Sequence, residues 1–142
     1  MTEVSEILAA GLSAARLRVN VLAANIANAE TTKTDAGGPY KRRDVVQVAH
    51  TTEGSFSSTL DKMQLSKPAV FAVVEDHAEP RKVFQPGHPD ADKDGFVSYP
   101  NVNVVTTMTD LMSASRLYQA NVTALETVRQ MERDASTLST AV

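Results

Sequence analysis

Cysteine is missing from the 142-residue chain, and a strong excess of one charge is missing as well. Without cysteine there are no disulfides, no thiolate metal sites and no thiol catalysis. The net charge is only −3, with the signs interspersed, so we expect binding neither to nucleic acid nor to an acidic membrane surface. The one basic cluster, residues 41–43, is interpreted as a solvated lead-in to a strand or as a surface that pairs with acidic neighbours.

Long apolar runs and a secretion signal are also lacking. Arg16, Arg18 and Asn20 interrupt the best candidate for a membrane span, which needs roughly 20 apolar residues. The first residues include Glu3 and Glu6, where a cleaved signal peptide would carry positive charge. We therefore expect no direct membrane span and no cleaved signal peptide.

Groups of residues that carry catalysis or hold a metal are scarce. His50, His77 and His88 lie on separate segments, without the i, i+4 spacing that puts two ligands on one helix face, and surface or loop positions are expected for them. The chain has no Gly-x-Ser-x-Gly elbow and no glycine-rich loop followed by Lys-Ser or Lys-Thr. We expect no enzymatic activity, no cofactor and no metal site.

The acidic segment 90–95 resembles the beginning of an EF-hand calcium loop, with carboxylates at positions 1, 3 and 5 and glycine at position 6. The twelfth position is Asn101, where such a loop needs a bidentate glutamate. Pro86 and Pro89 also stand where the entering helix would lie. A solvated acidic turn is the preferred interpretation, and weak, adventitious cation binding is the alternative.

Apolar residues recur at helical spacing near both ends of the chain. The N-terminal stripe consists of Leu8, Leu12, Ala15, Val19, Leu22, Ile26 and Ala29. The C-terminal stripe consists of Leu111, Ala114, Tyr118, Asn121, Leu125, Val128, Glu132 and Ala135, and it is widened toward a second neighbour by Leu117, Ala124, Met131 and Leu138. These patterns predict one helix over residues 5–30 and another over 103–140.

Asparagines and one glycine interrupt the apolar stripes. Asn25 and Asn28 flank the N-terminal stripe, and Asn121 lies within the C-terminal one. Such residues are either solvent-exposed or fix helix register and partner choice, and we favour the second interpretation for Asn121. Gly11 costs about 1 kcal/mol relative to alanine inside a helix. It is either simply tolerated or allows another helix to approach closely.

The segment between the helices has a shorter period and more proline. Strands are predicted around residues 45–48 and 70–74, and short edges at 83–84 and 96–97. An exposed Gly-Gly-Pro loop is expected within 31–39, and a turn-rich connection at 54–58. The middle of the chain is therefore predicted to be a small β-rich insert.

These elements predict an α+β fold in which the long terminal helices pack as a coiled-coil-like hairpin or tube. Residues 1–35 and 102–142 would form the helical domain, and residues 36–101 the β-rich insert. An insert only about 30 Å across cannot cover helices of roughly 40 and 55 Å. Apolar surface therefore either stays bare or is buried against neighbouring subunits. The candidate subunit-interface residues are Leu8, Leu12, Val19, Leu22, Asn25, Ile26, Asn28, Leu111, Tyr118, Asn121, Leu125 and Val128.

Residues 17–31, LRVNVLAANIANAET, resemble the N-terminal signature of the bacterial flagellar axial proteins, the rod and hook family. The resemblance continues through the GPYKRR segment at 38–43 and through residues 84–92, 95–97 and 100–105. It also includes MTDLMSASRLYQANV at 108–122. Nearly the whole chain is covered in order, although Lys33 stands where many members have glycine.

The resemblance implies a structural subunit of the proximal rod of the flagellar basal body, assembled in the periplasm. It implies export by the flagellar type III apparatus and transmission of torque from the motor ring to the distal rod and hook. The implied partners are further copies of the chain, the rod proteins FlgB, FliE, FlgF and FlgG, the export apparatus and the MS ring. Two alternatives stay open: a cytoplasmic helical-hairpin adaptor that binds a partner helix, and a calcium-responsive module that rests on the acidic turn alone.

Overall fold

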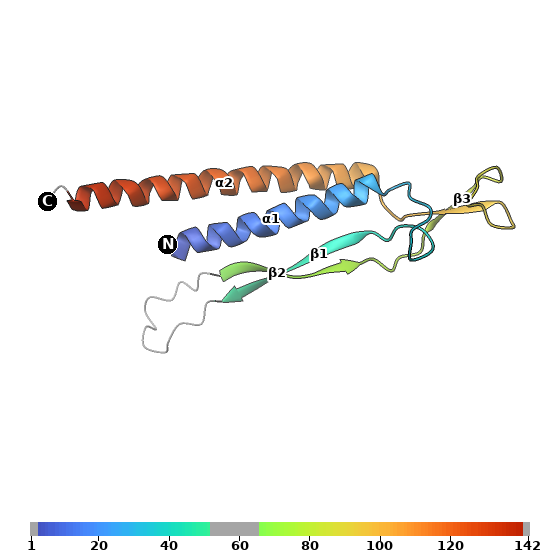
Figure 1. Ribbon diagram of the computed structural model, residues 1–142, viewed down its shortest axis with the longest axis horizontal. Coiled ribbons are helices and arrows are strands. Elements are labelled where there is room, and N and C mark those ends of the chain that lie inside the picture. The colour runs from blue at the N-terminus through green and yellow to red at the C-terminus, as the bar shows by residue number, and fades with distance from the viewer. Residues whose placement is uncertain (1–2, 52–65, 141–142) are drawn as a thin grey trace.

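The computed structural model describes residues 3–51 and 66–140. In chain order its elements are α1 (Glu3–Ala27), β1 (Arg43–Thr51), β2 (Ser66–Glu75), β3 (Arg81–Phe84), β4 (Phe96–Tyr99) and α2 (Val104–Thr140). The predicted α+β fold, with long terminal helices and a small β-rich insert, is confirmed (Figure 1). The predicted connection at 54–58 lies outside the described residues.

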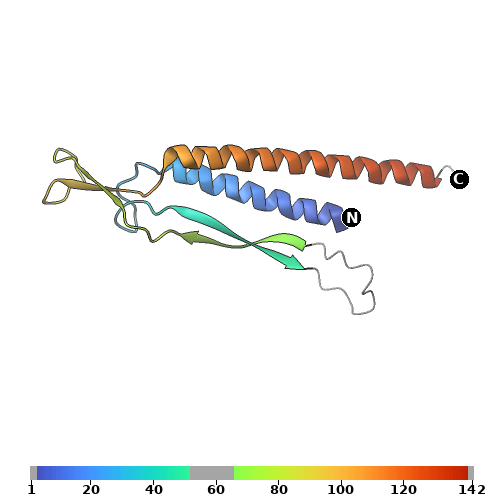
Figure 2. The same cartoon turned by 180° about the vertical axis from the view of Figure 1, so that it is seen from behind.

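Helix α1 lies between α2 and the β1–β2 hairpin, as Figure 1 and Figure 2 show from opposite sides. It packs against all three elements, whereas α2 packs on none of the described strands. The two helices run antiparallel, and α2, with 37 residues against 25, extends well past the N-terminal end of α1. The C-terminal part of α2 is therefore uncovered by the described chain.

Small side chains bring the elements close to α1. Ala14 and Ala15 are buried on α1, and Ala114 is buried on α2. A Cβ atom built on Gly11 would lie 3.5 Å from Nδ2 of Asn121 on α2 and 3.9 Å from Cγ of Pro68 on β2. Both interpretations of Gly11 stay open, because a Cβ atom there would meet these two side chains only at ordinary contact distance.

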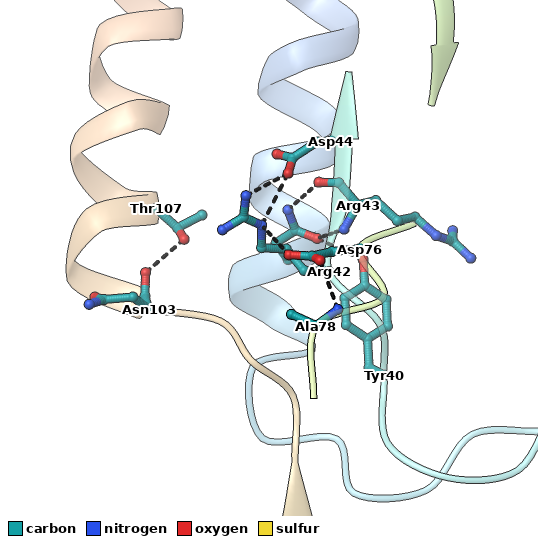
Figure 3. A network of polar contacts seen from close by, with 9 residues as sticks. Tyr40, Arg42, Arg43, Asp44, Asp76, Ala78, Asn103 and Thr107 are labelled. Carbon is teal, nitrogen blue, oxygen red and sulfur yellow. Dashed lines mark hydrogen bonds and ion pairs between the residues drawn. The ribbon is translucent and has the colours of Figure 1, made fainter. Parts of the chain in front are cut away.

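Side-chain hydrogen bonds mark the facing ends of the two helices. Asn103 precedes α2; its Oδ1 accepts the N–H of Thr106 (3.1 Å), and its carbonyl accepts the N–H and the hydroxyl of Thr107 (2.9 and 2.7 Å) (Figure 3). After α1, Nδ2 of Asn28 donates to the carbonyl of Ala24 (2.9 Å). The helix stops at Ala27, three residues before the predicted end: the N–H of Asn28 still bonds the carbonyl of Ala24 (3.0 Å), but the N–H of Ala29 bonds Ile26 (3.2 Å), a tighter turn that ends the helix.

The strands form two separate antiparallel hairpins. Strand β1 pairs with β2 from Arg43–Glu75 to Thr51–Ser66, and the register shifts between Val46 and Gln47. Strand β3 pairs with β4, and the rings of Phe84 and Phe96 meet edge to face at 5.3 Å. An isolated two-stranded hairpin is marginally stable in water. The β1–β2 hairpin consequently depends on α1, which covers one of its faces.

The expectation about apolar run length needs correction. Residues Val4–Ala27 reach a mean hydropathy of 1.4 and are long and apolar enough to cross a membrane by length and composition alone. Arg16 and Arg18 are too few to lower the average below that level. In this structure the apolar composition has a packing role, because α1 is flanked by α2 on one side and by a hairpin on another.

Candidate assembly interface

The helical hairpin itself covers part of every candidate interface residue. Leu22 on α1 and Leu125 on α2 are buried, at 8% and 9% exposure, and the two helices pack against each other. The half-buried candidates are Leu8, Leu12, Val19, Ile26, Asn28, Leu111, Tyr118, Asn121 and Val128. The stripes thus serve first to pair the two helices of one chain. Additional contacts of these residues with other subunits stay a prediction.

Asn25 has a different position from the one expected for a subunit contact. It is only 1% exposed. Its Nδ2 donates to the carbonyl of Arg43 (2.7 Å), and its Oδ1 accepts the N–H of Arg43 (2.9 Å) and the hydroxyl of Tyr40 (3.0 Å). One amide therefore bonds both backbone groups of the first β1 residue, as a neighbouring strand would. This Asn25 joint connects α1 to β1 inside the subunit and leaves no Asn25 surface for a neighbour.

Asn28 likewise has an intrachain role. Besides donating to Ala24, it accepts a hydrogen bond from the hydroxyl of Thr31 at its Oδ1 (3.2 Å). Asn121 lies over Gly11, so it faces the partner helix of its own chain. A register-fixing role of Asn121 would therefore act first between α1 and α2.

Ion pairs surround the Asn25 joint at the start of β1 (Figure 3). Arg42 pairs with Asp44 and, at 3.8 Å, with Asp76, while Arg43 pairs with Glu75 at 3.1 Å. The hydrogen bond to Asp44 raises the pKa of Arg42. The basic cluster therefore pairs with acidic neighbours, which was one of its two interpretations. These pairs are largely exposed, so each contributes little stability.

Tyr40 completes the joint from the loop before β1. Burial raises the pKa of its hydroxyl, and the nearby Arg43 guanidinium, 5.8 Å from the ring centroid, opposes that shift. The neutral hydroxyl donates to Asn25, so its proton is part of the contact. Neither Tyr40 nor its pairing with Asn25 was predicted, because 15 residues separate the two in sequence.

Two sets of apolar side chains on α2 stay exposed in the described chain. The outer stripe consists of Val105, Met108 and Met112, which are 75%, 48% and 56% exposed. The lateral stripe consists of Leu117, Ala124 and Met131, of which Leu117 and Met131 are more than half exposed. The lateral stripe is therefore uncovered within the single chain, and its burial against neighbouring subunits stays a prediction; the side chain of Leu138 lies outside the described part. The outer stripe was missed, although its spacing of three and four residues was visible.

The outward face of the β1–β2 hairpin is apolar too. Val46, Val48 and Val74 are each 40–46% exposed. By contrast, Val45, Gln47 and Pro68 line cavities shared with α1. The subunit thus presents uncovered apolar side chains on the hairpin as well as on α2. Exposed apolar side chains grouped on an element in this way are typical of proteins that bind further chains.

The acidic turn 90–95 is held by its own carboxylates. Oδ1 of Asp92 accepts the N–H groups of Asp94 (3.0 Å) and Phe96 (2.8 Å), and Oδ2 of Asp90 accepts the hydroxyl of Thr32 (2.7 Å). Gly95 adopts a φ of +80° there. Within residues 3–51 and 66–140 there is no group of three or more histidine or acidic side chains that could hold a metal ion. The turn is built by hydrogen bonds in this structure.

Two family models match the segments that contain the terminal helices. "Flagella basal body rod protein" matches residues 6–33, and "Flagellar basal body rod FlgEFG protein C-terminal" matches residues 93–138. The flagellar basal-body rod protein FlgC of Salmonella typhimurium is 36% identical over 138 residues, covering 97% of both chains. The chain belongs to the FlgC family of flagellar basal-body rod proteins. The FlgC proteins of Borreliella burgdorferi and Bacillus subtilis are each 37% identical over 134 residues, covering 88% and 87% of both chains.

Membership in the FlgC family confirms the resemblance drawn from residues 17–31 and 108–122. These two segments lie mainly on α1 and α2, respectively. The chain is a structural component of the flagellar basal-body rod and assembles with other rod components. The exposed apolar stripes of α2 are the candidate surfaces for that assembly.

Proposed function

We propose that this FlgC-family chain is a non-enzymatic subunit of the proximal rod, where it transmits torque from the motor ring to the distal rod and hook. We further propose that the flagellar type III apparatus exports it unfolded and that it assembles in the periplasm. Its neighbours would be copies of itself, the rod proteins FlgB, FliE, FlgF and FlgG, and the MS ring. Membership in the FlgC family of rod proteins favours this role over the cytoplasmic adaptor, which we set aside.

The observation that carries this proposal is the uncovered apolar surface of α2. Leu117 and Met131 are 53% and 64% exposed on a helix that already packs against α1. A fully exposed apolar side chain of this size gains roughly 1.5–3 kcal/mol when it is buried. Several such side chains per subunit therefore favour association strongly. A subunit that offers apolar surface on more than one face suits an extended assembly better than a closed pair.

Torque transmission requires a subunit that does not deform under load. The Asn25 joint supports that role, because two hydrogen bonds link Asn25 on α1 to the backbone of Arg43 at the start of β1, and a third comes from Tyr40 in the preceding loop. We propose that residues 1–35 and 102–142 build the rod wall and that 36–101 form the insert outside it. In this proposal the half-buried candidates, such as Leu8 and Val128, contact neighbouring subunits at their exposed edges.

The experiment is complementation of a strain that lacks this gene. We expect the wild-type chain to restore swimming in soft agar and to be present in purified basal bodies by mass spectrometry. A Leu117→Asp, Met131→Asp double variant should be exported but should restore neither rods nor swimming, because two carboxylates would face an apolar contact. The matched control changes two exposed polar positions of α2, Thr123→Asp and Gln130→Glu, and should swim. Basal bodies that lack the wild-type chain in complemented, swimming cells would contradict the proposal.

A further inference from the structure

Strands β3 and β4 and the turn between them form an arm, residues 81–99, that points away from the helices (Figure 1). Of the described helices and strands, β3 and β4 contact only each other. Val97 on β4 is nevertheless fully buried, so its cover comes from the arm itself and from the loops beside it. The direction of the arm is therefore set by loops rather than by packing on a helix or on the other hairpin.

The two covalent connections of the arm pass through a hollow waist. Residues 76–80 join the arm to β2, and residues 100–103 join it to α2. A cavity of about 280 Å³ lies between these connections and residues 39–42 of the loop before β1. Side chains do not fill the waist, so the two connections alone leave the arm room to change direction.

A third link to the arm comes from the loop between α1 and β1, residues 28–42. The hydroxyl of Thr32 in this loop donates to Oδ2 of Asp90 in the arm (2.7 Å). Within the described residues, no other hydrogen bond joins this loop to the arm. Hydrogen bonds to a carboxylate are stronger than those between neutral groups. The contact of Thr32 with Asp90 thus ties the arm to the segment that follows α1.

Local hydrogen bonds hold both sides of this contact in place. On the loop side, the carbonyl of Thr31 accepts the N–H of Tyr40 (3.0 Å), and the hydroxyl of Tyr40 donates to Oδ1 of Asn25 on α1 (3.0 Å). On the arm side, the N–H of Asp90 donates to Nδ1 of His88 (3.1 Å). Hydrogen bonds therefore connect the last turns of α1, through the loop, to the arm.

We infer that the loop of residues 28–42 is a brace, which makes the arm follow the direction of α1, and that the hydrogen bond between Thr32 and Asp90 fastens it. With the bond made, the arm keeps one angle to the helices; with the bond broken, the arm turns at the waist. A hydrogen bond to a charged acceptor changes such an equilibrium about tenfold, at the low end of its usual range. The brace belongs to the single chain, so it holds or fails independently of the proposed function.

Distances between two spin labels, measured by pulsed electron paramagnetic resonance, test the brace in the purified full-length chain, which has no cysteine of its own. The labels are attached at Ala23→Cys on α1 and at Lys93→Cys in the arm, both exposed positions. We expect one narrow distance distribution. Thr32→Val keeps the shape of the side chain but removes its hydroxyl, and it should split or broaden the distribution, because the population with a detached arm rises about tenfold. Asp90→Ala should have the same effect.

Three controls accompany these variants. Thr32→Ser keeps the hydroxyl and should retain the narrow distribution. Asp94→Ala removes an exposed carboxylate from the same turn and should retain it as well. A second pair of labels, at Ala23→Cys on α1 and at Gln130→Cys on α2, measures the distance between the helices and should give the same result in every variant.

Four outcomes overturn the inference. The native distribution could already be as broad as that of the variants, or Thr32→Ser could broaden it as much as Thr32→Val. A distribution for Thr32→Val as narrow as the native one would show that packing around Val97 holds the arm without the hydrogen bond. A change in the distance between the helices as large as the change in the arm would show that the bond supports the whole fold. The proposed function survives all four, and it fails separately if the wild-type chain is missing from basal bodies.

Discussion

Replacing Asn25 by aspartate keeps the size and shape of the side chain but converts its hydrogen-bond donor into an acceptor. In the native chain, Nδ2 of Asn25 lies 2.7 Å from the carbonyl oxygen of Arg43, and the residue is 1% exposed. In the variant two acceptors face each other at that distance. The carbonyl loses its buried partner, which costs about 1–3 kcal/mol. The buried negative charge adds to this cost, although Tyr40 and the N–H of Arg43 still donate to it.

The Asn25→Asp variant should therefore lose about 3 kcal/mol or more of unfolding free energy at neutral pH. Burial raises the pKa of the new carboxyl group in the folded chain above that in the unfolded chain. The folded state then binds more protons, so stability is greatest below the unfolded pKa and is lost as the pH rises through the folded pKa. Mild acid should restore much of the stability, because a protonated aspartic acid can donate to Arg43 again.

Urea unfolding followed by circular dichroism, at about pH 4 and about pH 7, measures this effect. Asn20→Asp is the matched control, because Asn20 is an exposed asparagine on the same helix. Asn25→Ala serves as the comparison without a titrating group and should be destabilised at both pH values. The reasoning is refuted if Asn25→Asp is as stable as Asn20→Asp at neutral pH, or if its deficit does not shrink in acid.

Three further predictions concern single positions. Gly11→Ala should raise the unfolding free energy by about 0.5–1 kcal/mol in the same urea assay, because the new Cβ would be in ordinary contact at 3.5 Å; a destabilised variant would show that the space is not there. Burial raises the pKa of Tyr40 above its usual 10.0, so its contribution to stability is complete below pH 10 and is lost as the pH rises further. Tyr40→Phe should reduce this loss of stability at alkaline pH, measured by thermal melts across the pH range. An unchanged dependence of stability on pH would show that Tyr40 is not its cause. Calcium should bind no tighter than about millimolar in a calorimetric titration, whereas micromolar binding that disappears in Asp92→Ala would contradict the account of the acidic turn.

Periodicity predicted the parts of the fold that depend on local chemistry. The steps of three and four residues located both helices, and the valine-rich segments located the strands, because these patterns report which face of an element is buried. The end of α1 was placed three residues late, since the N–H of Ala29 bonds Ile26 in a tighter turn and periodicity does not detect such an end. The apolar character of α1 could have been predicted from composition, but Arg16 and Arg18 were given too much weight against the mean hydropathy of the segment.

Residue spacing could not predict the contacts between segments that are distant in sequence. Asn25 flanks an apolar stripe, so sequence reasoning placed it at a subunit contact, whereas its partner is the backbone of a strand 18 residues away. Backbone groups are the same in every residue, and the sequence of β1 therefore carries no sign of this bond. The outer stripe of α2 was missed for another reason. Met108 and Met112 lie opposite the longer inward stripe, which dominates the pattern.

The central claim is that the α1–α2 hairpin builds the rod wall through the apolar faces that it leaves uncovered. A cryo-electron microscopy map of the purified basal body, at side-chain resolution in the rod, tests it most directly. The account predicts that α1 and α2 of this chain pair in the rod wall as they do here, with Met112, Leu117 and Met131 buried against neighbouring subunits. A map in which the chain occupies the rod while these side chains face solvent would contradict the claim.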